Sequence, residues 1–431
     1  MEKSRKWQRL FIAATGLILF AAIGCTAAGT PGGFYNNGLA AVRYENAWGY
    51  VDTDGTVIVD FQYDEAFAFE RGVAIVMDND EAILIDATGT VIASANYDLL
   101  DIDDETGLVW YKKAGKIGLL NRSGAVLVAG DYAFPAWVTM NVWAPAFHEG
   151  RAVMFDGAHY GFIDTIGTWV IEPTYAEAGD FCFDLAPVRL GDKWGYIDEI
   201  GNVAIEFLYD EAASFGERGL ALVTLAGDEA LIKTDGMAVL SGFYRIVITA
   251  DMIFGTIGEI HGLYDQNGTL LVSFSRTIWN FEILNERFIR FFEVMGTTNA
   301  IYDGDGQICR EYASGSDEAP DDWMAVDKEI WFIFETGTTV TLSGEHKTFT
   351  IDAEAYVAPA TGYQIIASRD GLLGVVGFKG NVVVDFIYAG IGVTADGYFL
   401  VSPPDTAAFG CLDRKGRTVL SAIYNDIRVG Q

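Results

Sequence analysis

One glycine returns eleven times along this chain at nearly even spacing, and this regularity limits the folds that the chain can adopt. An acidic or amide residue usually stands three positions before it, as Asp52 stands before Gly55. A fixed period of a few tens of residues is typical of repeat architectures, whose units bury their faces against their neighbours. The recurring glycines are Gly55, Gly89, Gly124, Gly167, Gly201, Gly236, Gly268, Gly306, Gly337, Gly380 and Gly416.

Each repeat contains three segments with the composition of β-strands, as in 38–42, 48–52 and 56–59. Short β-branched and aromatic runs that end at turn residues predict strands. Between the last two segments, Asp-x-x-Gly predicts a hairpin turn in which the Asp side chain caps backbone N–H groups and the glycine takes a positive φ. We therefore predict a three-stranded meander. A short fourth strand or a helical turn is expected after the Tyr-Asp pair that often follows, as at Tyr63-Asp64.

The best-preserved positions of the repeat are interpreted as structural. The glycine before the aromatic residue lets a neighbouring backbone or ring pack closely, and the aromatic residue is expected between adjacent units. Lys233, Phe334 and Gly377 replace the acidic anchor in degenerate copies. The repeat-core residues are Trp48, Gly49, Asp52, Gly55, Gly118, Gly161, Asp164, Gly167, Trp194, Gly195, Asp198, Gly201, Gly262, Asp265, Gly268, Gly374, Gly380, Gly410, Asp413 and Gly416.

The repeat predicts an all-β chain of about eleven three-stranded meander units over residues 38–427, with 280–360 the least regular stretch. Meander units of this length can stand radially as propeller blades. Eleven blades in one closed ring would be unusually many, so an open superhelical array, two smaller propellers and a β-solenoid are alternatives. The chain starts with a first segment at Gly38 and ends with a third segment at Tyr424–Ile427. We therefore expect whole units, with none shared by the two termini.

The clearest copy of the repeat reads Lys193-Trp194-Gly195-Tyr196-Ile197-Asp198 and continues to Gly201 and Tyr209-Asp210. It resembles the WG (KWG) repeat of bacterial proteins, and the units anchored at Asp52 and Asp164 are similar to it as well. The resemblance implies an all-β repeat protein that is often exported, and it supplies no active site.

The N-terminus has the pattern of a targeting signal. Four basic residues within positions 3–9 precede an uncharged, mostly apolar run over 10–23, which predicts a secretory signal over residues 1–24. Ala22-Ile23-Gly24-Cys25 resembles the lipobox of bacterial lipoproteins, which implies an acylated Cys25 and attachment to the cell membrane or cell surface. Residues 25–37 are expected to form a flexible tether. Plain secretion and an uncleaved anchor are the alternatives.

The charge of the chain restricts its partners. Sixty acidic residues against 28 basic ones give a formal net charge of −32. Such a surface repels nucleic acids and anionic lipids and favours cationic partners or neutral glycans. The expected partners are the membrane, through the lipid anchor, and an envelope protein or cell-wall polymer.

The sequence contains no recognisable catalytic or cofactor motif. None of the four histidines is spaced as a metal pair, and neither an HExxH nor a GxSxG pattern occurs. We predict no catalytic residue, no metal and no cofactor. The turns 52–55 and 303–306 each carry two carboxylates that could attract calcium, but hairpin chemistry explains them. Cys182, Cys309 and Cys411 show no ligand spacing, and buried free thiols are expected.

The leading hypothesis is therefore a non-catalytic, surface-tethered binding or scaffolding protein of the bacterial cell envelope. An envelope glycan hydrolase that uses loop carboxylates and a purely structural array are the alternatives. Trp137 and Trp143 lie in the long insertion between the units anchored at Asn121 and Asp164. Insertions in repeat arrays map to loops on one face, which is often the binding face, so these two aromatics are candidate ligand contacts.

Overall fold

The computed structural model describes residues 38–428, except 53, 133–144, 217, 249–252, 258–259, 275–277, 284–287, 294–297, 304, 314–319, 327–328, 337, 345–346, 361 and 395–396. These residues form strands, turns and loops, and none of them is helical. Among them, no helix offers the length and hydropathy that a membrane crossing requires. The predicted all-β class is confirmed.

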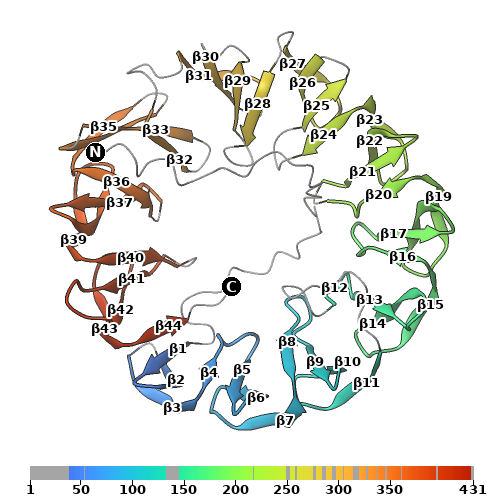
Figure 1. Cartoon of the computed structure of the whole chain (residues 1–431), viewed down its shortest axis with the longest axis horizontal. Helices are drawn as coiled ribbons and strands as arrows, with labels where there is room; N and C mark the ends of the chain where they lie inside the picture. Colours follow the sequence, from blue (N-terminus) through green and yellow to red (C-terminus); the bar gives the residue numbers. More distant parts are fainter. Residues whose placement is uncertain are drawn as a thin grey trace.

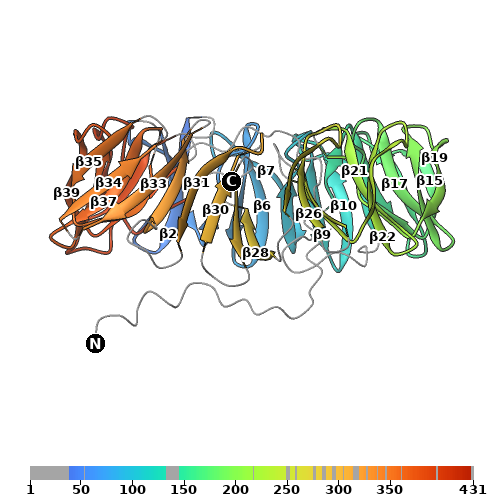
Figure 2. The same ribbon diagram turned by 90° about the horizontal axis from the view of Figure 1, so that it is seen from above.

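The strands form eleven four-stranded antiparallel sheets that stand as blades around one closed ring (Figure 1). Seen from the side, the ring is a flat disc that is one blade thick (Figure 2). The chain is therefore a single eleven-bladed propeller. The open array, the two smaller propellers and the β-solenoid are not the arrangement that the structure adopts.

Each blade contributes one strand to each of four concentric positions, and the strands at each position run in order from blade 1 to blade 11. The innermost strands are β44 (Asp426–Arg428), β4 (Glu65–Ala66), β8 (Leu99–Ile102), β12 (Phe147–His148), β16 (Glu177–Ala178), β20 (Glu211–Ala212), β24 (Arg245–Ile248), β28 (Ile278–Ile283), β32 (Asp322–Val326), β36 (Ala355–Pro359) and β40 (Gly390–Val393). The second strands are β1 (Leu39–Tyr44), β5 (Val73–Asp78), β9 (Val109–Lys113), β13 (Arg151–Phe155), β17 (Leu185–Leu190), β21 (Leu220–Leu225), β25 (Ile253–Ile257), β29 (Ile289–Glu293), β33 (Glu329–Glu335), β37 (Gln364–Arg369) and β41 (Phe399–Ser402).

The two outer positions hold the strands on either side of the Asp-x-x-Gly turn. The third strands are β2 (Ala47–Asp52), β6 (Glu81–Asp86), β10 (Lys116–Leu120), β14 (Tyr160–Asp164), β18 (Lys193–Asp198), β22 (Asp228–Lys233), β26 (Ile260–Tyr264), β30 (Thr298–Tyr302), β34 (Thr339–Ser343), β38 (Leu372–Gly377) and β42 (Phe409–Leu412). The outermost strands are β3 (Val57–Tyr63), β7 (Val91–Tyr97), β11 (Val126–Tyr132), β15 (Trp169–Tyr175), β19 (Val203–Tyr209), β23 (Ala238–Phe243), β27 (Leu270–Phe274), β31 (Ile308–Ala313), β35 (Thr348–Asp352), β39 (Val382–Tyr388) and β43 (Thr418–Tyr424).

The blade is offset by one strand from the sequence repeat. The short strand that follows the Tyr-Asp pair does not join the three strands before it. Strand β4, for example, pairs with β5 of the next blade through Glu65↔Met77 and Ala66↔Val76. The predicted three-stranded meander thus gains a fourth strand from the preceding repeat.

The same offset closes the ring. Strand β44, the last short strand, pairs with β1 through Ala41↔Arg428, Val42↔Ile427 and Arg43↔Asp426. The expectation that no unit is shared by the two termini is therefore wrong, because blade 1 combines strands from both ends of the chain. The irregular stretch 280–360 follows the common plan and supplies most of blades 8 and 9, β28–β31 and β32–β35.

The Asp-x-x-Gly turns have the hydrogen bonds that the sequence pattern predicts. Asp52 Oδ1 accepts from the backbone N–H of Asp54 at 2.9 Å and of Thr56 at 2.8 Å. Gly55 takes a φ of +79°, and its N–H donates to the Asp52 carbonyl. The same side-chain cap recurs at Asp86, Asn121, Asp164, Asp198, Asp265, Asp303 and Asp413.

The glycine of the Trp-Gly pair lies opposite a bulge in the outermost strand. Pairing shifts from Trp48↔Tyr63 to Tyr50↔Val59, which pushes the β3 backbone toward Gly49. A Cβ on Gly49 would lie 2.5 Å from the Val59 carbonyl oxygen, so the close approach requires glycine. Carbonyl oxygens approach Gly161, Gly195, Gly374 and Gly410 in the same way, whereas side chains crowd Gly118 and Gly262.

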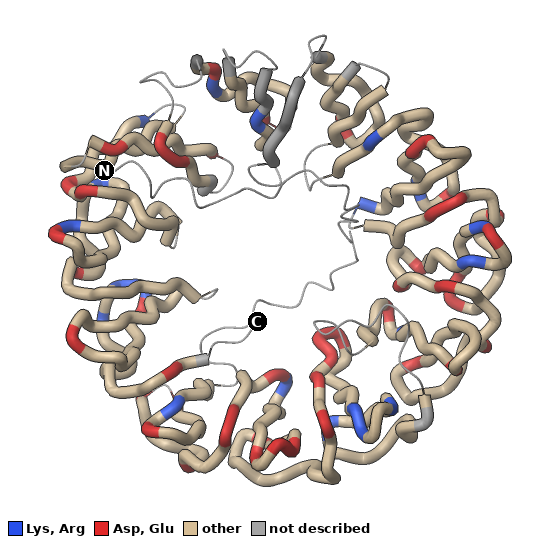
Figure 3. Tube along the Cα trace, viewed as in Figure 1, with Lys and Arg blue, Asp and Glu red and all other residues tan. Residues whose placement is uncertain are grey.

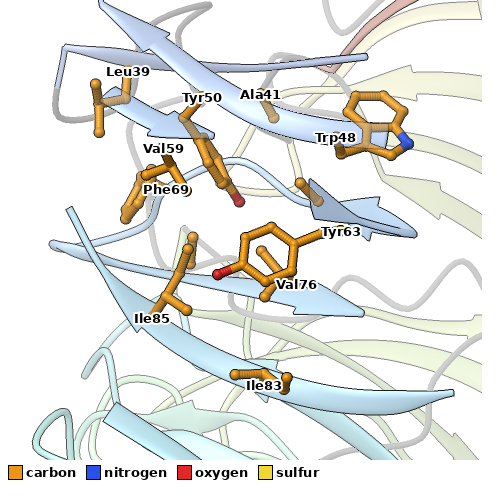
Figure 4. Close-up of a cluster of buried hydrophobic side chains, with 12 residues drawn as sticks. Leu39, Ala41, Trp48, Tyr50, Val59, Tyr63, Phe69, Val76, Ile83 and Ile85 are labelled. Carbon is orange, nitrogen blue, oxygen red and sulfur yellow. The ribbon is translucent and has the colours of Figure 1, made fainter. Parts of the chain in front are cut away.

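Aromatic pairs fill the space between adjacent blades. Tyr50 on β2 is fully buried, packs edge-on against Phe69 at 4.7 Å between ring centroids, and donates its hydroxyl to the Phe67 carbonyl (Figure 4). Phe162–Phe181 and Tyr196–Phe215 repeat the contact at 4.9 Å. The aromatic residue of the repeat thus lies where adjacent units meet.

The cysteines differ from the expectation of buried free thiols. Cys411 is buried and free, whereas Cys309 is free but exposed. Cys182 is buried. Proximity in sequence to an apolar stretch is therefore a poor guide to the exposure of Cys309.

Candidate functional site

One face of the ring carries two sets of connections from every blade. Because consecutive strands are antiparallel, the loop from the innermost to the second strand and the Asp-x-x-Gly turn emerge on the same face. We call this the turn face, and we call the first of these connections the inner loop of a blade. The inner loops of blades 4 and 5, for example, are residues 149–150 and 179–184.

Two glutamates of the inner loops connect neighbouring blades on the turn face. The Glu105 carboxylate of blade 3 accepts from the backbone N–H of Glu149 at 3.0 Å and of Gly150 at 2.7 Å, both in blade 4. Glu149 in turn accepts from the N–H of Phe183 and Asp184 in blade 5, each at 2.8 Å. A carboxylate of one inner loop therefore binds the backbone of the next, and we call this contact an inter-blade staple.

Asp103 strengthens the junction between blades 3 and 4. Its side chain is buried, with an exposed fraction of 5%. One oxygen accepts from the N–H and the hydroxyl of Thr106 within its own loop, and the other accepts from the Phe147 N–H of blade 4 at 2.7 Å. At the junction between blades 2 and 3 a basic side chain connects the two blades, because the Arg71 guanidinium donates to the Asp104 carbonyl.

Carboxylates also gather at the inner rim where blades 2 and 3 meet. Partial burial, together with the charges of Asp104 and Asp101, raises the pKa of Glu70 to about 7, although Arg71 acts in the opposite direction. Desolvation by the surrounding rim, with the charges of Asp104 and Asp103, raises the pKa of Asp101 to about 6. We call Glu70, Asp101 and Asp104 the rim carboxylates. Part of this group holds protons near neutral pH.

The junction between blades 5 and 6 has no such carboxylate at the corresponding position. Phe183 occupies the place that Glu149 has in blade 4, just before the second strand, and both residues have a positive φ. In blade 6 the inner loop carries one residue more and bonds to itself. Gly216 N–H donates to the Leu220 carbonyl, and Gly219 N–H donates to the Gly216 carbonyl at 2.8 Å. The blade 6 loop therefore satisfies these donors without a staple.

A pocket of about 310 Å³ lies over this junction on the turn face. It is bounded by the inner loops of blades 5 and 6 and by the turns of blades 6 and 7. None of the lining residues that the structure describes is acidic. They are Phe183, Arg218, Gly219, Leu220, Lys233, Thr234, Gln266 and Asn267.

On the opposite face of the ring, hydrogen bonds connect blades 5 and 6. Asp210, of the Tyr-Asp pair between blades 5 and 6, accepts from Lys193 Nζ in blade 5 at 2.5 Å and from the Ala226 N–H in blade 6 at 2.7 Å. Asp64 and Asp321 accept from hairpin N–H groups of the following blade in the same way. The Tyr-Asp pair of the sequence thus marks a second staple, on the face opposite the pocket.

Several sequence-predicted residues do not enter this site. Cys25, Trp137 and Trp143 lie outside the described residues, and the repeat-core residues serve turns and blade packing. In the turn 52–55, Asp52 already binds two N–H groups with one oxygen. Among the described residues no group of three or more His, Cys, Asp or Glu side chains is arranged to hold a metal ion.

Sequence reasoning missed the residues that shape the site. Glu105, Glu149 and Phe183 stand in loops outside the repeat motif, and the partners of the two glutamates lie about one repeat further along the chain. One signal was visible in the sequence, because Lys233 replaces the acidic anchor of the repeat. Its side chain cannot accept the turn N–H groups, and it lines the pocket instead.

Comparison with known proteins identifies the repeat. The model of the WG containing repeat matches residues 48–81, 160–194 and 194–227, which together are less than half of the chain. Among curated proteins no match is found.

Solved structures share only distant likeness with the chain. A eukaryotic initiation factor has 8% identity and a TM-score of 0.40, covering 91% of this chain and 98% of its own. Hsv2p from Kluyveromyces lactis has 9% identity and a TM-score of 0.31, covering 58% and 99%. PorZ, a surface component of the type-IX secretion system of Porphyromonas gingivalis, has 11% identity and a TM-score of 0.24, covering 86% and 59%. At these values the matches carry no argument about function.

Proposed function

We propose that this ring of WG-type repeats is a non-catalytic scaffold of the bacterial cell envelope that binds a basic segment of a partner protein along its acidic inner edge. An eleven-bladed propeller of WG repeats fits a binding or scaffolding role. The proposal adds the chemistry of the partner, the place where it binds and the compartment.

The observation that carries this proposal is the charge of the innermost strands. Acidic residues are distributed around the described part of the ring, including its inner edge near β8 (Figure 3). Among the side chains that the structure describes, five blades carry an exposed carboxylate on the innermost strand, and Glu177 is paired with Arg189 at 2.5 Å. The five residues are Glu65, Asp101, Glu177, Glu211 and Asp322.

The circular arrangement makes these separate charges act on one partner. A flexible basic segment that pairs with one carboxylate meets the next at a high effective concentration, so weak contacts add up. A net charge of −32 also speeds the encounter with a cationic partner. The rim carboxylates link binding to pH, because a cation that pairs with Glu70 or Asp101 displaces a proton held near neutral pH.

The envelope location rests on the N-terminal sequence. The basic residues, the apolar run and Cys25 support export and lipid attachment of the mature chain. Cys25→Ser tests this part alone. We expect incorporation of labelled palmitate and membrane fractionation of the natural chain, and loss of both in the variant. Membrane fractionation of Cys25→Ser without label would contradict the lipid anchor.

The binding itself is tested with a defined probe. A fluorescent 20-residue Lys-Ala repeat peptide is titrated into the purified protein at low and high salt, with a Glu-Ala peptide of equal length for comparison. We expect binding of the basic peptide only, with loss at high salt.

A matched pair of triple variants locates the contact. Glu65→Gln/Asp101→Asn/Glu211→Gln neutralises the inner edge, and Asp60→Asn/Glu172→Gln/Glu206→Gln removes the same charge from outermost strands β3, β15 and β19. We expect about a tenfold loss of affinity in the first and less than about twofold in the second. Equal losses would contradict the inner-edge site. Salt-resistant retention by a cell-wall glycan fraction, without peptide binding, would replace the protein partner by a carbohydrate.

A further inference from the structure

The pocket over blades 5 to 7 is lined by two basic side chains. Arg218 and Lys233 contribute two cations, and none of the lining residues that the structure describes is acidic. This occurs in a protein with 60 acidic and 28 basic residues. A guanidinium and an ammonium in one pocket are the groups that proteins use to bind carboxylates and phosphates.

Both cations lie in the pocket because the repeat is altered there. Lys233 stands at the anchor position, where Asp52 and its equivalents accept two turn N–H groups. In the altered turn Asp235 accepts from the Met237 N–H instead, which leaves the anchor side chain without its capping role. Places where a repeat departs from its own local rule are expected at functional sites.

The remaining lining residues add an apolar surface and neutral polar groups. The Phe183 side chain is 43% exposed, and its ring lies against Gly219, where an added Cβ would be 3.6 Å from Cε1. Thr234, Gln266 and Asn267 supply hydroxyl and amide groups that can donate and accept hydrogen bonds. A volume of about 310 Å³ is at the small end of the range for ligand pockets.

We propose that this pocket binds an acidic monosaccharide, a sugar that carries a carboxylate or a phosphate. The anionic group lies between Arg218 and Lys233, the sugar ring packs on Phe183, and the hydroxyl groups bond to Thr234, Gln266 and Asn267. The site is separate from the acidic inner edge, because it binds the opposite charge and is lined mainly by loops and turns of the turn face instead of the innermost strands. The negative surface repels long polyanions, whereas a small anion inside the pocket lies within the screening length of the two cations.

The proposal is tested by calorimetric titration of the purified protein with four probes. D-glucuronate and glucose 6-phosphate represent the two anionic groups, while glucose and inorganic phosphate represent the separate parts. We expect binding of at least one acidic sugar below about 10 mM, and at least about tenfold weaker binding of glucose and inorganic phosphate. Absence of binding by both acidic sugars overturns the proposal. Inorganic phosphate that binds as tightly as the sugar phosphate overturns it as well.

Lys233→Asp is the decisive variant because it restores the residue that the repeat has elsewhere. It therefore keeps or improves the turn while it reverses the charge in the pocket. Lys379→Asp makes the same substitution in the turn of blade 10, two residues after the anchor Gly377, and serves as the control for the change in charge. We expect at least about a tenfold loss of acidic-sugar affinity in Lys233→Asp, with an unchanged or higher melting temperature, and no loss in Lys379→Asp. Equal losses in the two variants would overturn the assignment to this pocket.

Discussion

The junction between blades 4 and 5 and the junction between blades 5 and 6 use the same loop position in different ways. At the first, the Glu149 carboxylate binds the N–H groups of Phe183 and Asp184. At the second, Phe183 takes the equivalent position and faces a pocket. The following loop decides between them, because the blade 6 loop bonds the Gly219 N–H to its own Gly216 carbonyl. When the backbone N–H of the next blade already has an acceptor in its own loop, the residue at the staple position no longer has to be a carboxylate.

The largest effect that tests this comparison is expected at the most buried staple. Asp103→Ala removes a buried carboxylate that binds Thr106 in its own loop and the Phe147 N–H of blade 4. We expect a loss of about 2–4 kcal/mol in the free energy of unfolding, because buried donors lose their acceptor. Urea denaturation measures it, with exposed Glu206→Ala as the control at less than about 0.5 kcal/mol. A loss no larger than that of the control would mean that staples do not hold the blades.

Glu149→Ala is expected to have a smaller effect, because its two hydrogen bonds are exposed to water. We expect a loss of about 1–2 kcal/mol, and roughly half of it in Glu149→Gln, whose amide oxygen still accepts. Hydrogen exchange at the Phe183 and Asp184 amides reports the loss of these two hydrogen bonds locally, and it should be faster in Glu149→Ala. Unchanged exchange would show that water or another group replaces the carboxylate.

The junction between blades 2 and 3 should instead respond to pH. Glu70 keeps its proton up to about pH 7 in the folded protein, whereas the unfolded chain releases it near the ordinary pKa of 4.5. Between these values the folded state binds more protons, so stability falls as pH rises from about 4.5 to about 7. In Glu70→Gln this fall should shrink, by less than about 1 kcal/mol because the group is partly solvated. A steeper fall in the variant would contradict the raised pKa.

The smallest change in stability is expected from a substitution that introduces the Glu149-type staple at the junction between blades 5 and 6. Phe183→Glu should alter stability by less than about 0.5 kcal/mol, because the Gly219 N–H already has an acceptor. The reverse change, Glu149→Phe, should cost about as much as Glu149→Ala. Thermal unfolding of both variants compares the two junctions directly. An increase in stability of about 1 kcal/mol or more in Phe183→Glu would show that the junction between blades 5 and 6 has a backbone donor that a staple could still bind.

The sequence predicts the parts of this fold that local chemistry determines. An Asp three residues before a Gly dictates a capped turn, and Gly49 is needed where the β3 bulge approaches. The predicted aromatic contact between units also agrees with the Tyr50–Phe69 pair. Each of these features depends on residues that are neighbours in the sequence or that recur in most repeats.

Closure and strand exchange are harder to predict because their signal is short. Strand β4 contains only Glu65 and Ala66, which is too few residues for a periodic pattern, and its partner belongs to the next repeat. The candidate site has the same difficulty. Phe183 and Arg218 meet only because two loops of different length become adjacent in the ring, whereas Lys233 stands out as an altered anchor.

The pairing of β44 with β1 also determines when the ring can close during synthesis. Among the described strands, β1 of blade 1 is synthesised before all the others, and its inner partner β44, at 426–428, is synthesised after all the others. Until then the inner edge of β1 has unpaired N–H and C=O groups, which is the kind of edge that recruits other chains. Every chain that lacks β44 therefore carries an open strand edge at β1. We expect selection to favour features that prevent such incomplete chains from associating before β44 is in place.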